Sequence, residues 1–131
     1  MQLNEQEVKN LVESALAARL HAYAPYSNFL VGAVILSEDG HIFEGCNVEN
    51  ASFGLTICAE RSAVSAAIAK GQRQWRAIAV ASLGAVTPCG ACRQVLHEFG
   101  KEIEVILVDA ESCQIRARWT TGELLPGAFS L

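Results

Sequence analysis

The sequence lacks long hydrophobic runs and clusters of positive charge. No apolar stretch approaches the ~18 residues of a membrane-spanning helix, so we expect no membrane association. The first residues, Met1 to Glu5, have neither the basic nor the apolar region of a secretory signal, which predicts a cytoplasmic protein. Lysine and arginine total 10 against 14 acidic residues, and the net charge of −4 comes without any basic run. We therefore expect no binding to the phosphate backbone of nucleic acids.

A full set of paired cysteines is also missing, because the chain has five, an odd number. That count suits free thiols in a reducing compartment better than a disulfide framework. Only three histidines are present, none at ligand spacing, so we expect no imidazole in a metal site. Of the 131 residues, 51% are hydrophobic and 18% are charged, which excludes a disordered chain. This length and composition predict one folded domain, residues 1–131.

Helical and strand patterns alternate along the chain. Asn4 and Glu7 have the spacing of a capping box, and apolar residues recur at helical spacing after them. The turn signal from Ser37 to Gly40 separates two strand-like runs and predicts a β-hairpin. The expected helices are 4–20, 58–70 and 89–99, with a last helical turn at 123–125, and the expected strands are 29–36, 41–48, 76–82, 103–108 and 114–119. This alternation predicts an α/β fold in which a five-stranded mixed sheet has helices on both faces, a three-layer α/β/α sandwich.

Three cysteines stand at the starts of two predicted helices. The C-x-x-C motif Cys89-Gly90-Ala91-Cys92 follows a strand, and by itself it fits either two metal ligands or a thioredoxin-like redox pair. Cys58 also begins a helix after a loop, and two adjacent helices in a layered fold can direct their N-termini to one point. A trio of thiolates at helix N-termini favours Zn²⁺, one ion per chain, over a redox pair.

Three protein ligands leave one tetrahedral position of zinc open for water, which is typical of a catalytic site. A structural site would normally need a fourth protein ligand. Cys46 and Cys113 are the two remaining cysteines, but neither lies in a ligand-like pair. We expect both to be small, buried, apolar residues.

Charged residues beside the three cysteines fit catalysis. Glu60, two residues after Cys58, is placed to take a proton from a zinc-bound water and pass it to a substrate, although an acidic residue in a first helical turn also suits the helix dipole. Arg61 and Arg93 are expected to donate hydrogen bonds to thiolate sulfurs and so reduce the negative charge. The alternative is that both arginines form ordinary surface pairs.

Several motifs together resemble a known enzyme family. Cys58-Ala59-Glu60 followed by Pro88-Cys89-Gly90-Ala91-Cys92 resembles the signature of zinc-dependent nucleobase deaminases. The sequence is most similar to the short cytidine deaminases with three cysteine ligands. That resemblance extends nearly end to end, through Tyr23-Ala24-Pro25-Tyr26-Ser27, Gly45-Cys46-Asn47-Val48-Glu49-Asn50 and Leu124-Leu125-Pro126. It implies a homotetramer and a five-stranded mixed sheet.

The resemblance also implies the reaction and the nucleoside contacts. Cytidine and 2′-deoxycytidine would be hydrolysed to uridine and 2′-deoxyuridine in pyrimidine salvage, with zinc-bound hydroxide attacking C4 and ammonia leaving. Asn47 and Glu49 would hydrogen-bond the ribose hydroxyls, since an amide and a carboxylate at a strand end can hold a diol. The backbone N–H of Ala59, with Glu60, would bind the base edge.

Aromatic residues complete the implied pocket. Phe29 would form one wall, and Phe129 would cross a subunit boundary to stack on the pyrimidine, which makes each site composite. Phe53 stands where the family often has a tyrosine, so a phenolic hydrogen bond would be lost there. Burial in the core or the tail is the alternative for Phe29 and Phe129.

Other functions remain as alternatives. A deaminase for a modified nucleoside such as blasticidin S would share the zinc motif, but not the full Asn-Val-Glu-Asn string that contains Asn47 and Glu49. A polynucleotide-editing deaminase would need a basic groove, which the net charge of −4 argues against. A non-catalytic zinc module leaves Glu60 without a purpose, and a thioredoxin-like oxidoreductase leaves Cys58 unexplained.

Overall fold

The computed structural model describes residues 3–131, and within them five strands form one sheet. The strands are β1 (Gly32–Ser37), β2 (Ile42–Cys46), β3 (Trp75–Ser82), β4 (Glu104–Asp109) and β5 (Gln114–Thr120). Their order across the sheet is β2-β1-β3-β4-β5. β3 and β4 pair in parallel, whereas the other neighbours pair antiparallel, so the sheet is mixed, as predicted.

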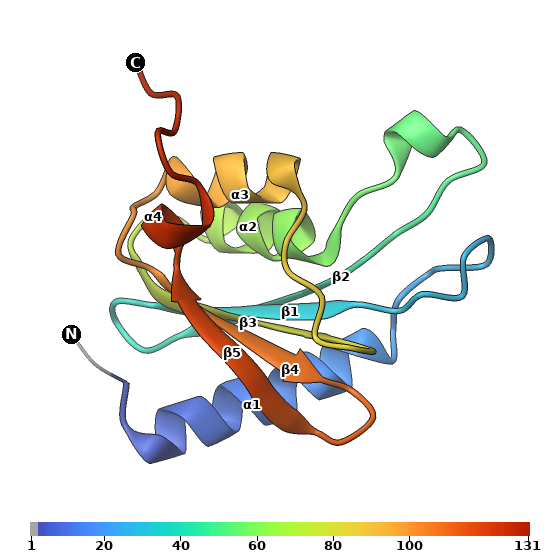
Figure 1. Ribbon diagram of the computed structural model, residues 1–131, viewed down its shortest axis with the longest axis horizontal. Coiled ribbons are helices and arrows are strands. Elements are labelled where there is room, and N and C mark those ends of the chain that lie inside the picture. Colours follow the sequence, from blue (N-terminus) through green and yellow to red (C-terminus); the bar gives the residue numbers. More distant parts are fainter. Residues whose placement is uncertain (1–2) are drawn as a thin grey trace.

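Helices cover both faces of this sheet (Figure 1). They are α1 (Glu5–Arg19), α2 (Ala59–Ala69), α3 (Gly90–His97) and α4 (Thr121–Leu124), with a short 3₁₀ helix, η1 (Phe53–Leu55). α1 lies against one face, and α2, α3 and α4 lie over the other (Figure 1). This arrangement confirms the predicted three-layer sandwich. No helix within residues 3–131 has the length and apolar character needed to span a membrane.

Two buried clusters, one on each face of the sheet, hold the layers together. Side chains of a strand alternate between its two faces. Val34 and Leu36 of β1 therefore lie in the cluster that contains Leu11 of α1, whereas Ile35 lies in the cluster that contains Ala63 of α2. All residues of β1 are buried, which explains why its sequence is a continuous apolar run.

Two glycines allow helices to lie directly on the strands. A Cβ at Gly32 would lie 2.2 Å from the Ala15 carbonyl oxygen in α1, and a Cβ at Gly45 would lie 2.4 Å from the Ala63 nitrogen in α2. No side chain fits at such distances. Gly45 in β2 therefore sets how closely α2 approaches the sheet, and with it the position of the residues that begin α2.

The hairpin is shorter than its apolar sequence predicts. Residues 29–31 precede β1, and the Asn47 side chain binds two of their backbone groups in place of a neighbouring strand. The Val31 N–H donates to Asn47 Oδ1 (2.9 Å), and Asn47 Nδ2 donates to the Phe29 carbonyl oxygen (2.8 Å). One amide side chain thus ends the ladder and fixes the segment that carries Phe29.

Three other local features differ from the sequence prediction. η1 has no counterpart in it, and the last helix begins at Thr121 rather than 123, because Thr120 and Glu123 form a capping box. The prediction that Cys113 is buried is wrong. Cys113 is exposed in the β4–β5 turn with a φ of 61°, a left-handed conformation that the tight turn requires. Cys46 is partly buried.

We expect Gly45→Ala to lower the free energy of unfolding by about 1–3 kcal/mol, because the added methyl group overlaps the backbone of α2. Urea unfolding at a fixed protein concentration measures the change. Gly54→Ala is the control, since a Cβ there meets no atom within 4 Å. Equal stabilities of the two variants would contradict the close approach of α2 to β2.

Candidate active site

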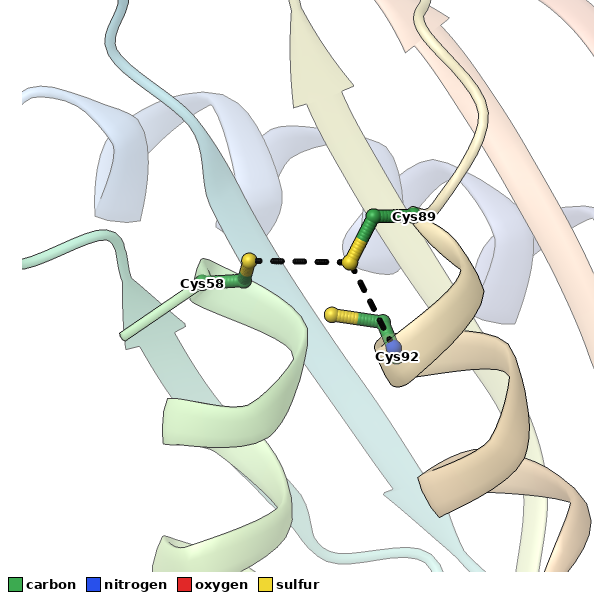
Figure 2. Close-up of side chains that lie close together, drawn as sticks. All are labelled: Cys58, Cys89 and Cys92. Carbon is green, nitrogen blue, oxygen red and sulfur yellow. Dashed lines mark hydrogen bonds between the residues drawn. The ribbon is translucent and has the colours of Figure 1, made fainter. Parts of the chain in front are cut away.

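Cys58 and Cys89 are the N-cap residues of α2 and α3. Both have extended backbone conformations, with φ and ψ of −71° and 154° at Cys58 and −67° and 168° at Cys89. Each therefore stands at the point where a loop turns into a helix. Figure 2 shows the side chains of Cys58, Cys89 and Cys92 directed toward one another from the starts of these two helices.

The geometry of the three thiols fits a zinc ion. Their Sγ atoms all lie within 4.8 Å of one another, and those of Cys58 and Cys89 are 3.9 Å apart. Tetrahedral zinc with Zn–S bonds of about 2.3 Å holds its sulfur ligands about 3.8 Å apart. Within residues 3–131 this is the only such group of three potential metal ligands, and Cys46 and Cys113 lie outside it. The site therefore offers three protein ligands, not the four of a closed structural site.

Neighbouring groups set the ionisation of the thiols. Burial raises the pKa of the Cys92 thiol, and the nearby Glu60 carboxylate raises it further. Partial burial opposes ionisation of Cys89 as well, but hydrogen bonding from Cys92, whose N–H donates to Cys89 Sγ (3.5 Å), lowers the Cys89 pKa overall. A bound dication removes this difference, because metal binding deprotonates thiols.

Arg61 supplies positive charge to the same thiols. Its Nη2 donates a hydrogen bond to Cys58 Sγ over 3.3 Å. Hydrogen bonding to Cys58 and then to Cys92 raises the pKa of Arg61, so the guanidinium stays charged. This contact is the one expected of Arg61 from its position in the sequence.

Arg93 differs from the sequence expectation of a contact with sulfur. In the described part of the chain, its hydrogen bonds run from Nε to the Pro88 carbonyl oxygen (2.7 Å) and from Nη1 to the Leu124 carbonyl oxygen (2.9 Å). The spacing in the sequence cannot distinguish a sulfur acceptor from a nearby carbonyl. Arg93 thus ties the residue before Cys89 to the end of α4.

Glu60 lies in the first turn of α2 and is only 6% exposed. Burial raises its pKa, while a backbone hydrogen bond and the charge of Arg61 act in the opposite direction. A rise in the pKa of a carboxyl group makes it a better proton acceptor when ionised and leaves it able to donate that proton again.

A cavity of about 210 Å³ opens beside Cys58, Cys89 and Glu60. Of the other residues predicted for the site, Phe29, Asn47 and Ala59 also line it. A larger hollow of about 570 Å³ between α1 and β5 contains none of the predicted site residues. The smaller cavity is therefore the one that combines metal-binding thiols, a buried acid and an aromatic wall.

Four residues that line this cavity were not predicted from the sequence: Val31, Val80, Ser82 and Val86. Thr56 and Thr87 stand just before the two cysteine helices, where the sequence leaves open whether they cap the helices or line the pocket, and both line the cavity. A signal for Val80 and Ser82 did exist, since binding sites in α/β sheets form beyond the carboxyl ends of strands. The C-x-x-C motif follows that end of β3 after the loop of residues 83–88.

Asn47 and Glu49 stand at the end of β2 and hold the loop that precedes β1. Besides its two bonds to that loop, Asn47 reaches the cavity. Glu49 accepts hydrogen bonds from the Ser27 hydroxyl and from the backbone N–H groups of Tyr26 (2.9 Å) and Ser27 (3.2 Å). The Ser27 hydroxyl, followed by these backbone groups, lowers the pKa of Glu49 and keeps it ionised.

Phe129 lies outside the cavity of its own chain. Its side chain is 71% exposed, and its carbonyl oxygen accepts a hydrogen bond from Gln94 Nε2 (3.1 Å). The C-terminal tail that carries it projects beyond α3 and α4 (Figure 1). The alternative of burial in the tail does not hold for Phe129, and Phe29 is likewise exposed in part rather than buried in a core.

The comparisons with known proteins point to one family. A family model described as the cytidine and deoxycytidylate deaminase zinc-binding region matches residues 5–108. A probable cytidine deaminase of Dictyostelium discoideum is 43% identical over 98% of this chain and 87% of its own. A cytidine deaminase of Halalkalibacterium halodurans is 46% identical over 92% of each chain.

A solved structure of cytidine deaminase from Burkholderia pseudomallei superposes with a TM-score of 0.88 at 48% identity, and the match covers 97% of this chain and all of the other. The resemblance stated from the motifs is thereby confirmed. Matches of this extent show that the chain belongs to the cytidine and deoxycytidylate deaminase family and is a zinc-dependent hydrolytic deaminase.

Proposed function

We propose that this chain deaminates cytidine and 2′-deoxycytidine to uridine and 2′-deoxyuridine, releasing ammonia. The observation that carries the proposal is that three clustered thiols and a buried glutamate adjoin one small cavity, which Asn47 also lines. Relatives at 43–47% identity that are named cytidine deaminases support the substrate class. The whole of residues 1–131 would act as one catalytic domain.

Cys58, Cys89 and Cys92 would hold one zinc ion per chain. When bound, zinc supplies the Lewis acidity that activates water at neutral pH. Three thiolates weaken that acidity by bringing negative charge to the site. Arg61, which donates to Cys58 Sγ, would offset part of this charge and keep the thiolates in position.

Glu60 would carry the proton during the reaction. Water adds to C4 of the cytosine ring, the amino nitrogen leaves as ammonia, and a carbonyl remains. Glu60 would accept a proton from the attacking water and deliver it to N3 of the pyrimidine, and would then pass the second proton, from the new C4 hydroxyl, to the departing amino group. The burial that raises its pKa supports this double role.

The cavity walls would select a free nucleoside. Ala59 opens α2, so its backbone N–H has no partner within the helix and can donate to the base edge, together with Glu60. Phe29 would pack along the pyrimidine. Asn47 and Glu49 would bind the ribose hydroxyls, since an amide and a carboxylate both keep hydrogen-bonding capacity beyond the loop contacts described above.

We propose further that the enzyme is a homotetramer with composite sites. Phe53 and Phe129 are 76% and 71% exposed, and Tyr26 packs edge-to-face on Phe53 at 6.1 Å between ring centroids. Large exposed aromatic groups of this kind mark surfaces where proteins associate. Phe129 would enter a neighbour's cavity and stack on the pyrimidine, and Phe53 would contribute only aromatic surface.

A role in pyrimidine salvage would follow from the reaction, because it turns a cytosine nucleoside into a uracil nucleoside. The five free thiols suit a reducing compartment such as the cytoplasm.

We expect zinc-loaded protein to convert cytidine and 2′-deoxycytidine with one ammonia released per turnover. A chelator should stop the reaction until zinc is restored. Ultraviolet absorbance, an ammonia assay and metal analysis measure these outcomes, with blasticidin S and single-stranded DNA as comparison substrates. Turnover of a comparison substrate alone, or of nothing by zinc-replete protein, would contradict the proposed function.

We expect Glu60→Gln to retain zinc and folded structure but to lose about 100-fold or more in kcat, the scale of general acid–base catalysis. Steady-state kinetics and metal analysis check this. Glu13→Gln, an exposed carboxylate on α1, is the matched control and should leave kcat unchanged. Near-normal turnover by Glu60→Gln would assign the proton transfer to another group.

Composite sites predict complementation between two defective chains. Phe129→Ala should raise the KM for cytidine about tenfold through lost stacking. Mixing it with Glu60→Gln under conditions of subunit exchange should restore activity, because an intact Glu60 then meets an intact Phe129 from a neighbour. Activity no higher than the sum of the two separate variants, or a fully active monomer in sedimentation, would rule out this role.

A further inference from the structure

We propose that Asp109, at the end of β4, is a positioning residue that holds the substrate-facing wall of the cavity. It would do so through the loop of residues 83–88, which connects β3 to the helix carrying Cys89 and Cys92. This inference rests on the proposed function, because it concerns the same cavity. Asp109 itself lies outside that cavity and touches none of the three thiols.

Asp109 is only 4% exposed, and its two carboxylate oxygens bind two different loops. Oδ1 accepts from the backbone N–H of Gly84 (3.0 Å) and, more weakly, from that of Glu111 (3.3 Å). Oδ2 accepts from the Ser112 hydroxyl (2.9 Å) and from Arg116 Nη2 (3.0 Å). One buried carboxylate thus joins the β3–α3 loop to the β4–β5 turn.

Ser82 is the partner of Asp109 across the β3–β4 ladder, and it holds the same loop from the other side. Its side chain is 1% exposed, and its hydroxyl accepts from the Val86 N–H (3.0 Å). Its carbonyl oxygen accepts from the N–H groups of Ala85 (3.1 Å) and Ala110 (2.9 Å). Three consecutive amides, from Gly84 to Val86, are therefore bound by polar groups at two adjacent strand ends.

The loop needs these contacts because its backbone is strained. Gly84 has a φ of 83°, and Ala85 has a φ of 51°, which is unfavourable for any residue with a side chain. The next two residues, Val86 and Thr87, form part of the cavity wall. Release of Gly84 therefore lets the turn relax and moves Val86 and Thr87.

Asp109 accepts these hydrogen bonds as an ionised carboxylate. Hydrogen bonding from the Gly84 backbone, followed by that from Ser112, lowers the pKa of Asp109 to about 2, so the group is charged at neutral pH. Hydrogen bonds to an ionised acceptor are about twice as strong as neutral ones.

The metal ligands have a separate anchor. Arg93 Nε donates to the Pro88 carbonyl oxygen (2.7 Å), and the Cys92 N–H donates to Cys89 Sγ. Pro88 itself is buried. Loss of Asp109 therefore affects the wall at Val86 and Thr87, while Cys89 stays in place.

The test is a comparison of Asp109→Ala with Arg116→Ala in zinc-loaded protein. We expect Asp109→Ala to raise the KM for cytidine about tenfold, the scale of one charge-assisted hydrogen bond, with kcat changed less than about threefold and one zinc retained per chain. Arg116→Ala removes the exposed partner of Oδ2 and leaves the Gly84 contact, so its KM should not change. Ser82→Ala, which releases Val86, should also raise KM, and it provides the test if Asp109→Ala does not fold.

Hydrogen–deuterium exchange separates this inference from the proposed function. The peptide spanning residues 83–88 should exchange faster in Asp109→Ala than in the parent and in Arg116→Ala, whatever the substrate. The role of Asp109 would be overturned if Asp109→Ala left exchange and KM unchanged, or if Arg116→Ala had equal effects. A loss of zinc or of kcat in Asp109→Ala without a change in KM would also overturn it. If the unsubstituted protein turns over no cytidine but Asp109→Ala still exchanges faster, the proposed function is wrong, whereas Asp109 still holds the loop of residues 83–88.

Discussion

The site depends on one constraint, the distance between three sulfur atoms on two helices. Zinc accepts thiolates only at about 2.3 Å, so the starts of α2 and α3 must be placed to within a few tenths of an ångström. Packing against the sheet supplies that accuracy. Gly45 lets α2 lie on β2 without an intervening side chain, and Arg93 holds the Pro88 carbonyl oxygen directly before Cys89. The metal centre is therefore determined by the core of the protein rather than by the C-x-x-C motif alone.

Electrostatics explains why the three thiols and Glu60 lie at helix N-termini. Three thiolates and Glu60 together concentrate negative charge in a partly buried site, which is costly in a medium of low dielectric. The N-terminal dipoles of α2 and α3 and the guanidinium of Arg61 offset this cost. Without a metal, the opposite pKa shifts of Cys89 and Cys92 show that the thiols cannot all ionise easily. A dication balances the set, so charge as well as geometry favours zinc.

The sequence predicts the parts of this structure that depend on local pattern and on motif spacing. The order of helices and strands, the layered fold and the ligand trio with Glu60 are all signalled by periodicity, capping residues or cysteine positions. Features that depend on distant side chains are not signalled. The apolar residues 29–31 resemble a strand, yet Asn47 takes their hydrogen bonds. Arg93 stands beside Cys92 in sequence, but its guanidinium reaches two carbonyl groups. Such contacts arise only once the chain is folded, as does the exposure of Cys113.

Different contacts anchor the metal ligands and the cavity wall. The starts of α2 and α3 carry the metal ligands, and Arg93 holds the residue before Cys89, whereas Ser82 and Asp109 hold the loop that forms the cavity wall. The two sets of contacts have no atom in common, so each anchors its own part of the site. A parallel β3–β4 pair makes this possible, because it brings the carboxyl ends of both strands, and the polar residues that end them, to the edge where α3 begins. The three thiols thus stand on helices, whereas the cavity wall at Val86 and Thr87 is anchored to the ends of two strands.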